Sequence, residues 1–214
     1  MSLPAFTPPA YECDLCPRLC EFHQVNRKAY PSFHNGPVPS FGELSAPLLV
    51  VGLAPGLKGA NQTGRPFTGD YAGLVLYSSL LKNGLAKGEY QERADDGLKL
   101  VDCRITNAVR CVPPENKPET SEIKNCNSFL KAEVAAMPNL KVILSLGLVS
   151  HNAVLRALGY KPTHGKFAHS AVHSLPKHGI TLVDTYHCSR YNINTNRLTQ
   201  AMFDAVVEKA KSFI

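Results

Sequence analysis

Short apolar runs alternate with stretches of helical periodicity along most of this chain. The apolar runs, which predict buried strands, lie at 48–53, 100–107, 141–146 and 180–186, with a weaker run at 172–175. The stretches of helical periodicity lie at 71–85, 121–137, 149–158 and 196–213. Because predicted strands and helices alternate, the sequence predicts an α/β protein with parallel strands.

The first forty residues depart from this pattern. They are rich in Pro and contain the run CDLCPRLC at 13–20. A segment of this composition has too little apolar surface to form its own core, so it needs a metal or the body of the protein to hold it. We therefore predict a single domain, 1–214, with an N-terminal cysteine-containing segment at 1–45 and an α/β body at 46–214.

Composition narrows the class of protein. With 44% apolar residues among 214, the chain can bury a sizeable core. The formal net charge of +6 weakly favours a polyanionic partner such as DNA or RNA. The sequence has no apolar run long enough to cross a membrane, and its first residues lack the basic and apolar regions of a secretory signal. We expect a cytoplasmic monomer.

The cysteines suggest a metal centre. Seven cysteines in a chain without a secretory signal indicate metal or redox chemistry before disulfides. Cys13 and Cys16 form a C-x2-C pair, and Cys111 and Cys126 form a C-x14-C pair much later in the chain. Four thiolates can hold either a tetrahedral zinc ion or an iron–sulfur cluster, and the spacing does not choose between them. Cys20 is an alternative ligand to Cys16.

A glycine-rich stretch at 52–73 joins the first predicted strand to the first predicted helix. It reads GLAPGLKGANQTGRPFTGDYAG, and its six glycines let the backbone turn tightly and approach a ligand closely. It matches neither a P-loop nor a dinucleotide-binding loop. Because open α/β sheets bind ligands where strands lead into helices, we expect an active site here.

Two other predicted strands end in polar residues. Asn107 stands at the end of the strand 100–107, and His187 directly follows the strand 180–186. The carboxyl ends of parallel strands meet at one edge of a sheet. We therefore expect Asn107 and His187 to lie near Asp70, the acidic residue of the glycine-rich stretch.

With these motifs together, the chain resembles the family 5 uracil-DNA glycosylases, the iron–sulfur group also called the B type. The resemblance rests on GLAPG at 52–56, NQTGRPFTGD at 61–70, TNAVRCVPP at 106–114, the loop that starts at His187 and the four-cysteine spacing. It spans residues 13 to about 195. The family's second motif usually reads His-Pro-Ser, whereas this chain has His187-Cys188-Ser189.

The resemblance implies a fold and a cofactor. The fold is a three-layer sandwich, with a central, mainly parallel four-stranded sheet flanked by helices. The N-terminal segment at 1–45 would be tied down by a [4Fe-4S] cluster. The implied cluster ligands are Cys13, Cys16, Cys111 and Cys126. Four thiolates that fully ligate iron leave no open position for water, so the cluster is expected to be structural.

The implied activity is base excision from DNA. The enzyme would flip uracil out of the helix, hydrolyse the N-glycosidic bond and leave an abasic site. Members of the family can also accept other deaminated bases such as hypoxanthine or xanthine, and the sequence does not settle this preference. The residues expected to act in catalysis are Asp70, His187 and Asn61. Those expected to bind the base are Phe67, Asn107, Gly52 and Ala54. Those expected to contact DNA are Arg65, Ser189, Arg190 and Tyr191.

These residue types suit the reaction. An asparagine amide is both donor and acceptor, so Asn107 can pair with a uracil edge. In the transition state the sugar becomes cationic and the base anionic. His187 would donate to a base oxygen, and Asp70 would polarise water or balance the sugar charge, unless it only caps the following helix.

Two other functions remain open from the sequence. A hydrolase of small nucleosides would use the same cavity without needing a DNA-binding surface. A non-catalytic iron–sulfur DNA-binding module would bind DNA without releasing a base. Base release and DNA binding together distinguish the three.

Overall fold

The computed structural model describes residues 6–214, so the start of the predicted N-terminal segment, 1–5, lies outside the described residues. The strands are β1 (Leu48–Gly52), β2 (Ala86–Lys87), β3 (Lys99–Leu100), β4 (Cys103–Asn107), β5 (Val142–Leu146), β6 (Val172–Leu175) and β7 (Ile180–Thr185). The α-helices are α1 (Pro17–Ala29), α2 (Ala60–Thr63), α3 (Tyr71–Lys82), α4 (Thr120–Ala135), α5 (Leu148–Ala157), α6 (Arg190–Asn194) and α7 (Gln200–Lys211). Short 3-10 helices lie at Pro114–Asn116 and Pro162–His164.

The central sheet has five strands in the order β4-β1-β5-β7-β6. The first four are parallel, and β6 pairs antiparallel with β7 at one edge. The prediction of a mainly parallel sheet is confirmed, but the predicted strand number of four was too small. The four strong apolar runs supply the parallel strands, and the weak run at 172–175 adds the edge strand, which is only partly buried.

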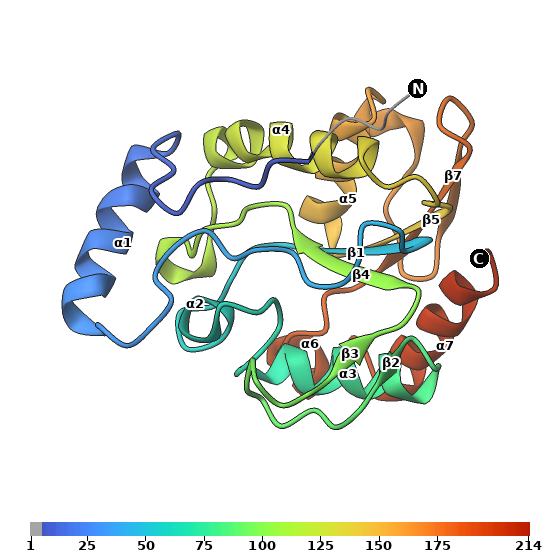
Figure 1. The fold of residues 1–214 in the computed structure, drawn as a ribbon. Helices are drawn as coiled ribbons and strands as arrows, with labels where there is room; N and C mark the ends of the chain where they lie inside the picture. Colours follow the sequence, from blue (N-terminus) through green and yellow to red (C-terminus); the bar gives the residue numbers. More distant parts are fainter. Residues whose placement is uncertain (1–5) are drawn as a thin grey trace.

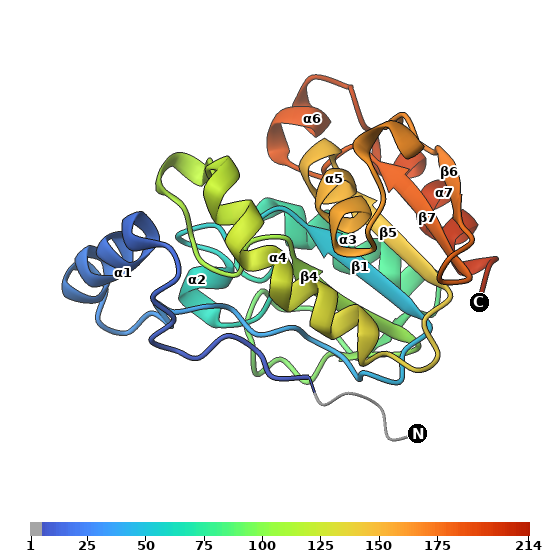
Figure 2. The same cartoon turned by 90° about the horizontal axis from the view of Figure 1, so that it is seen from above.

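Helices cover both faces of this sheet, as Figures 1 and 2 show. In β1, Leu48 and Val50 pack in the core under α3 and α7, whereas Leu49 and Val51 pack in the core under α4 and α5. Successive strand residues point to opposite faces, so a strand covered on both sides must be apolar throughout. This accounts for the continuous apolar run that predicted β1.

The strand order reverses direction at β1. The chain passes from β1 through α3 to β4 on one side of it, and then through α4 to β5 on its other side. Loops that leave the carboxyl ends of such strands diverge to opposite faces and leave a crevice between them. The glycine-rich stretch after β1 lies at this crevice.

Local backbone geometry shortens two of the predicted elements. The run 100–107 forms two strands, because Asp102 adopts a left-handed conformation (φ +51) between Leu100, which pairs with β2, and β4. The helix predicted at 71–85 ends at Lys82, because Gly84 (φ +69) turns the chain away. Among residues 6–214, no helix combines the length and hydropathy that crossing a bilayer requires.

Apolar packing and a charged pair hold the N-terminal segment to the body. Its helix α1, which the sequence did not predict, buries Leu19 against Val109. Arg18 donates two hydrogen bonds of 2.8 Å to Glu122 of α4, so a charged pair also joins the segment to the body. In Figure 1, α1 lies at one side of the molecule, away from the sheet.

A buried carboxylate ties α4 to β4. Glu133 is fully buried; its Oε1 accepts from Arg104 at 2.7 Å, and its Oε2 accepts from Thr106 at 3.1 Å and from Arg110. Burial acts to raise the pKa of Glu133, but Arg110 and Arg104 outweigh it and hold that pKa below its ordinary value. The network fixes the chain just before and just after Asn107.

We expect Glu133→Gln to lower the free energy of unfolding by about 3–5 kcal/mol, because it leaves two buried arginines without their counter-charge. Urea denaturation followed by circular dichroism measures this loss. The control is Glu208→Gln, an exposed residue of α7, which should change stability by less than about 0.5 kcal/mol. Equal stabilities for the two variants would show that the network does not stabilise the fold.

Candidate active site

A cleft of about 840 Å³ opens beside the carboxyl ends of β1 and β7. A smaller cavity of about 30 Å³ adjoins it and shares Ala54, Asp70 and His187 with the cleft. Phe67 and Asn107 complete the predicted residues that line the smaller cavity. The fold thus brings together five residues whose side chains come from three separate loops and strand ends.

Asp70 has a different environment at each carboxylate oxygen. It is the N-cap of α3, and Oδ1 accepts from the backbone N–H of Gly73 at 3.1 Å. Oδ2 faces Gly56 and Gly59, which line the cleft, and a Cβ at Gly59 would come within 2.5 Å of it. Burial raises the pKa of Asp70 above its ordinary value. Asp70 can therefore cap α3 through Oδ1 while Oδ2 stays available at the cleft.

His187 follows β7 and lines both cavities. Burial lowers its pKa to about 4, so the imidazole is neutral at physiological pH. Its ring stacks near that of Phe67, with centroids 6.1 Å apart and planes inclined by 28°. The side chain of Asn192 donates to the His187 carbonyl at 2.8 Å, and this bond fixes the loop that follows His187.

Cys188 explains how this loop is held without the proline of the usual motif. Its side chain is completely buried, and its thiol donates to the carbonyl of Ala72 in α3 at 3.5 Å. Burial raises the pKa of the thiol, so it stays protonated. A buried, neutral thiol is an anchor between the loop and α3, not a nucleophile.

Asn107 carries a buried acceptor oxygen that has no partner within residues 6–214. The residue is 3% exposed, and its Oδ1 has no hydrogen-bond partner among the described residues. Leaving such an oxygen unpaired costs about 1–3 kcal/mol, which is tolerated where a ligand supplies the donor. Gly52 lies against both this oxygen and the ring of Phe67, so a Cβ at position 52 would collide with both, although Gly52 is not among the described residues that line either cavity.

Asn61 is not brought to the cavity. We expected it to position the attacking water, but it is fully buried, and its Nδ2 donates to Asn35 at 2.9 Å. Its neighbour Ala60 lines the smaller cavity, whereas Asn61 is absent from the described residues lining either cavity. In this structure Asn61 lies behind the wall of the site.

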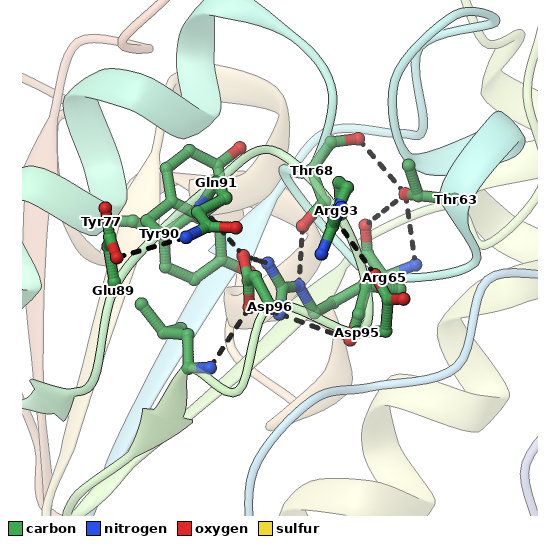
Figure 3. Close-up of polar contacts among 12 residues, drawn as sticks. Thr63, Arg65, Thr68, Tyr77, Glu89, Tyr90, Gln91, Arg93, Asp95 and Asp96 are labelled. Atoms are coloured by element: carbon green, nitrogen blue, oxygen red, sulfur yellow. Dashed lines mark hydrogen bonds and ion pairs between the residues drawn. The ribbon is translucent and has the colours of Figure 1, made fainter.

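Arg65 is also placed differently from our expectation of a DNA contact. It is 5% exposed, and its Nη1 and Nη2 donate to the carboxylate of Asp96 at 2.7 Å each. Its Nε donates to the Thr68 hydroxyl at 2.8 Å, as Figure 3 shows. A guanidinium whose donors are used inside the protein is unavailable to a phosphate, so Arg65 leaves the predicted DNA-contacting set.

Two of the other residues expected to contact DNA, Ser189 and Arg190, line the cleft, and the third, Tyr191, follows Arg190 on α6. Ser189 caps α6 by accepting from Asn192 at 3.4 Å, and it lines the cleft together with Arg190. The guanidinium of Arg190 lies over the ring of Tyr71, 5.1 Å from its centroid. Tyr191 is 71% exposed. These three side chains are accessible to a large ligand.

Asn116 lines the cleft, and sequence reasoning missed it. It follows Glu115, and both residues adopt left-handed conformations, with φ of 57 and 54 respectively. Consecutive residues in this region are uncommon outside functional sites and tight turns. The only sequence signal was its place after the Val-Pro-Pro run that follows Cys111.

Five cysteines line a small apolar cavity of about 20 Å³ between α1, α4 and the segment after β4. They are Cys13, Cys16, Cys20, Cys111 and Cys126. Burial, and secondarily the nearby thiols, raise the pKa of Cys111. The backbone N–H of Arg110 donates to the sulfur of Cys126 at 3.4 Å. Soft sulfur donors in an apolar cavity suit an iron–sulfur cluster, and the lining does not choose between Cys16 and Cys20.

A second polar cluster surrounds Asp184 of β7. Its carboxylate accepts from Ser145 at 2.6 Å, and it lies 2.9 Å from Nδ1 of His151 and 2.9 Å from Nε2 of His173. Neighbouring ligands around a tetrahedral zinc ion lie ~3.3 Å apart, given zinc–nitrogen bonds of about 2 Å. The observed separations are those of hydrogen bonds. We therefore interpret this cluster as a hydrogen-bonded part of the core.

Comparisons with known proteins agree with the fold and the motifs. The family model described as the uracil DNA glycosylase superfamily matches residues 39–211. A protein of Thermus thermophilus named Type-5 uracil-DNA glycosylase is 39% identical over 99% of this chain and 98% of its own length. Proteins of the same name from Mycobacterium leprae and Pyrobaculum aerophilum are 38% and 37% identical, over 98% and 92% of this chain and 95% and 87% of their own lengths. This chain therefore belongs to the uracil DNA glycosylase superfamily, in its type-5 group.

Proposed function

We propose that this chain excises uracil from DNA by hydrolysing the bond between the base and the sugar. The observation that carries the proposal is the convergence of Asp70, Asn107 and His187 on one cavity at the crevice of the sheet. The names of its type-5 relatives support the same activity. The steps below concern what each side chain does with a flipped uracil in this cavity.

Asn107 and Phe67 recognise the base in this proposal. The unpaired Oδ1 of Asn107 accepts from the ring N–H of uracil, and its amide N–H donates to the adjacent carbonyl. The ring of Phe67 stacks on the face of the base, next to the neutral imidazole of His187. Burying Oδ1 without a partner in the free protein favours a ligand that supplies a donor.

His187 and Asp70 act on the two charges that develop as the bond breaks. His187 is neutral, so it donates a hydrogen bond to a base oxygen through an N–H and does not transfer a proton. The ionised Asp70 uses Oδ2 to polarise the attacking water and to balance the cationic sugar. Asn116, whose Oδ1 faces Gly56 as Oδ2 of Asp70 does, helps to orient this water.

DNA contacts surround the mouth of the cleft. Lys58 and Arg190 line it, and both can pair with phosphates. Ser189 lies on the same rim. Tyr191, which is highly exposed on the same short helix as Arg190, fills the space that the extruded base leaves in the duplex.

The four thiolates of Cys13, Cys16, Cys111 and Cys126 hold a [4Fe-4S] cluster in this proposal. When bound, the cluster supplies a structural cross-link between the N-terminal segment and the body. The protein's own part is to present the sulfurs, exclude water with an apolar wall and donate the Arg110 N–H to Cys126. Seven unpaired cysteines suit a reducing compartment, so we also propose a cytoplasmic location. We also propose that the enzyme is a monomer.

The test of function is single-turnover base release from a duplex with one U·G mismatch. We expect free uracil and an abasic site, a 10²–10⁴-fold slower rate for Asp70→Asn and for His187→Ala, and DNA affinity close to that of the wild type. The control is Asp204→Asn, on α7, which does not line the cleft.

Three outcomes would contradict the proposal. DNA binding without release of any base would favour the non-catalytic module, and release only from small nucleosides would favour the nucleoside hydrolase. Unchanged rates in both variants would remove Asp70 and His187 from the catalytic set. Duplexes with hypoxanthine and xanthine, run alongside, measure how far the enzyme also accepts these bases.

The rate should depend on pH through Asp70. Its active form is ionised and its pKa is raised, so the rate should fall in acid, on a limb above the ordinary carboxyl value of 3.8. His187, with a pKa of about 4, stays neutral and should cause no loss between about pH 6 and about pH 9. Single-turnover rates from about pH 4 to about pH 9, with Asp70→Asn lacking the acid limb, check this. A limb near 6.5 would instead indicate a titrating histidine.

We expect Cys111→Ser to lose bound iron and to unfold at a lower temperature, because one of four ligands is removed and a polar hydroxyl enters an apolar cavity. Iron content and visible absorbance of the purified protein measure the loss. Cys103→Ala, a buried residue of β4 that is not part of this cavity, is the control. Full iron content in Cys111→Ser would exclude Cys111 as a ligand. Cys16→Ser and Cys20→Ser, compared directly, identify the fourth sulfur.

A further inference from the structure

A loop between β2 and β3, residues 88–98, closes over the back of the glycine-rich stretch. Its Asp96 pairs with the buried Arg65 through two bonds of 2.7 Å, and also accepts from the backbone N–H groups of Gln91 and Leu98 at 3.0 Å each. One carboxylate thus holds both the shape of this loop and its attachment to the glycine-rich stretch. Figure 3 shows Arg65 between Asp96 and Thr68.

Aromatic rings surround this ion pair. The guanidinium carbon of Arg65 lies 5.2 Å from the ring centre of Phe41, 5.4 Å from that of Tyr77 and 5.7 Å from that of Tyr90. The side chains of Arg65 and Asp96 are 6% and 0% exposed. The Arg65 contact and two backbone N–H groups keep the pKa of Asp96 well below its ordinary value. The pair is therefore a fixed, charged anchor inside the protein.

Side-chain hydroxyls hold three consecutive carbonyls next to this anchor. Tyr77 donates to the carbonyl of Pro66 at 2.6 Å, and Tyr90 donates to the carbonyl of Phe67 at 3.0 Å. The hydroxyl of Thr63 donates to the carbonyl of Thr68 at 3.1 Å. Each carbonyl in the middle of this turn is thereby fixed in direction by a separate residue.

The residue in the middle is conformationally strained. Phe67 has φ of +52, in the left-handed region that bulky side chains rarely adopt. This strain costs about 1–3 kcal/mol and persists only where surrounding contacts hold it. The Phe67 carbonyl occupies the space of a side chain at Gly73, so only glycine fits there. The conformation points the ring of Phe67 into the cavity beside His187.

We propose that Tyr90 is a positioning residue, anchored by the Arg65–Asp96 pair, that fixes the left-handed turn at Phe67 and thereby sets the width of the base cavity. The inference rests on the proposed stacking of Phe67 on the base. Without the hydroxyl bond the turn relaxes toward an ordinary conformation, and the ring moves out of its stacking position. Burial raises the pKa of Tyr90 to about 12, so the hydroxyl remains a donor throughout the working range of pH.

The test is Tyr90→Phe, which removes one oxygen and keeps the ring beside Arg65. We expect the single-turnover rate constant for uracil at saturating enzyme to fall about 3- to 10-fold, the effect of losing one hydrogen bond. DNA affinity should stay within about twofold. The preference for uracil over hypoxanthine should narrow, because a ring that is less fixed excludes the larger base less well.

The rate constant at saturation distinguishes positioning from a structural role, since partial unfolding lowers the amount of active enzyme and leaves this constant unchanged. The matched control is Tyr160→Phe, whose hydroxyl accepts from the Lys177 N–H at 2.9 Å, outside both cavities. Equal rate constants for Tyr90→Phe and Tyr160→Phe would overturn the proposal.

Phe67→Ala distinguishes a failure of the Tyr90 proposal from a failure of the proposed stacking of Phe67 on the base. A slow Phe67→Ala together with a normal Tyr90→Phe would leave Phe67 in the base site and reject Tyr90 as its positioning residue. A normal Phe67→Ala would reject the stacking role itself, and the positioning role with it. Asp96→Asn tests the Arg65–Asp96 anchor in the same assay. Because this variant leaves the buried Arg65 without its full counter-charge, its thermal unfolding is measured before its rate constant.

Discussion

Both proposed sites depend on the buried carboxylate of Glu133. One of its oxygens holds Arg104 and the other holds Arg110, so α4 is fixed to both ends of the segment that carries Asn107 and leads into Cys111. A buried charge is tolerated only while its partners surround it. A shift of α4 along β4 would therefore leave a buried charge without its partner. The base cavity and the cysteine cavity lie on different parts of the fold, but both are positioned by the same contact between α4 and β4.

The base cavity gathers features that weaken a fold. Asn107 has an unpaired buried oxygen, Phe67 has a strained backbone, and His187 is held in a site that disfavours its charged form. Such features persist only where the surroundings determine them strongly. Here the surroundings are a sheet buried on both faces, together with side-chain hydroxyls that hold the strained turn. The buried sheet and these hydroxyl contacts thus hold the base cavity in an otherwise unfavourable conformation.

The features that could be predicted from the sequence are those that short-range residue patterns encode. The strands of the parallel sheet were predictable because residues such as Leu48 and Leu49 are both buried, on opposite faces, and the convergence of Asp70, Asn107 and His187 followed from strand ends. Helix α1 was missed because its polar sequence buries little besides Leu19, His23 and Asn26. Arg65 was misassigned because its partner Asp96 lies 31 residues away, and no local pattern marks that pair. Asn116 was missed because its strained backbone is invisible in composition.

The cysteine cavity joins parts of the chain that are far apart in the sequence. Cys13 and Cys16 come from the N-terminal segment, whereas Cys111 and Cys126 come from the segment after β4 and from α4. In the proposed cluster these thiolates would close a long loop, and a cross-link of this kind restricts the unfolded chain more than the folded one. The cluster would therefore act on stability through the unfolded state, whereas the ion pair of Arg18 and Glu122 acts in the folded state.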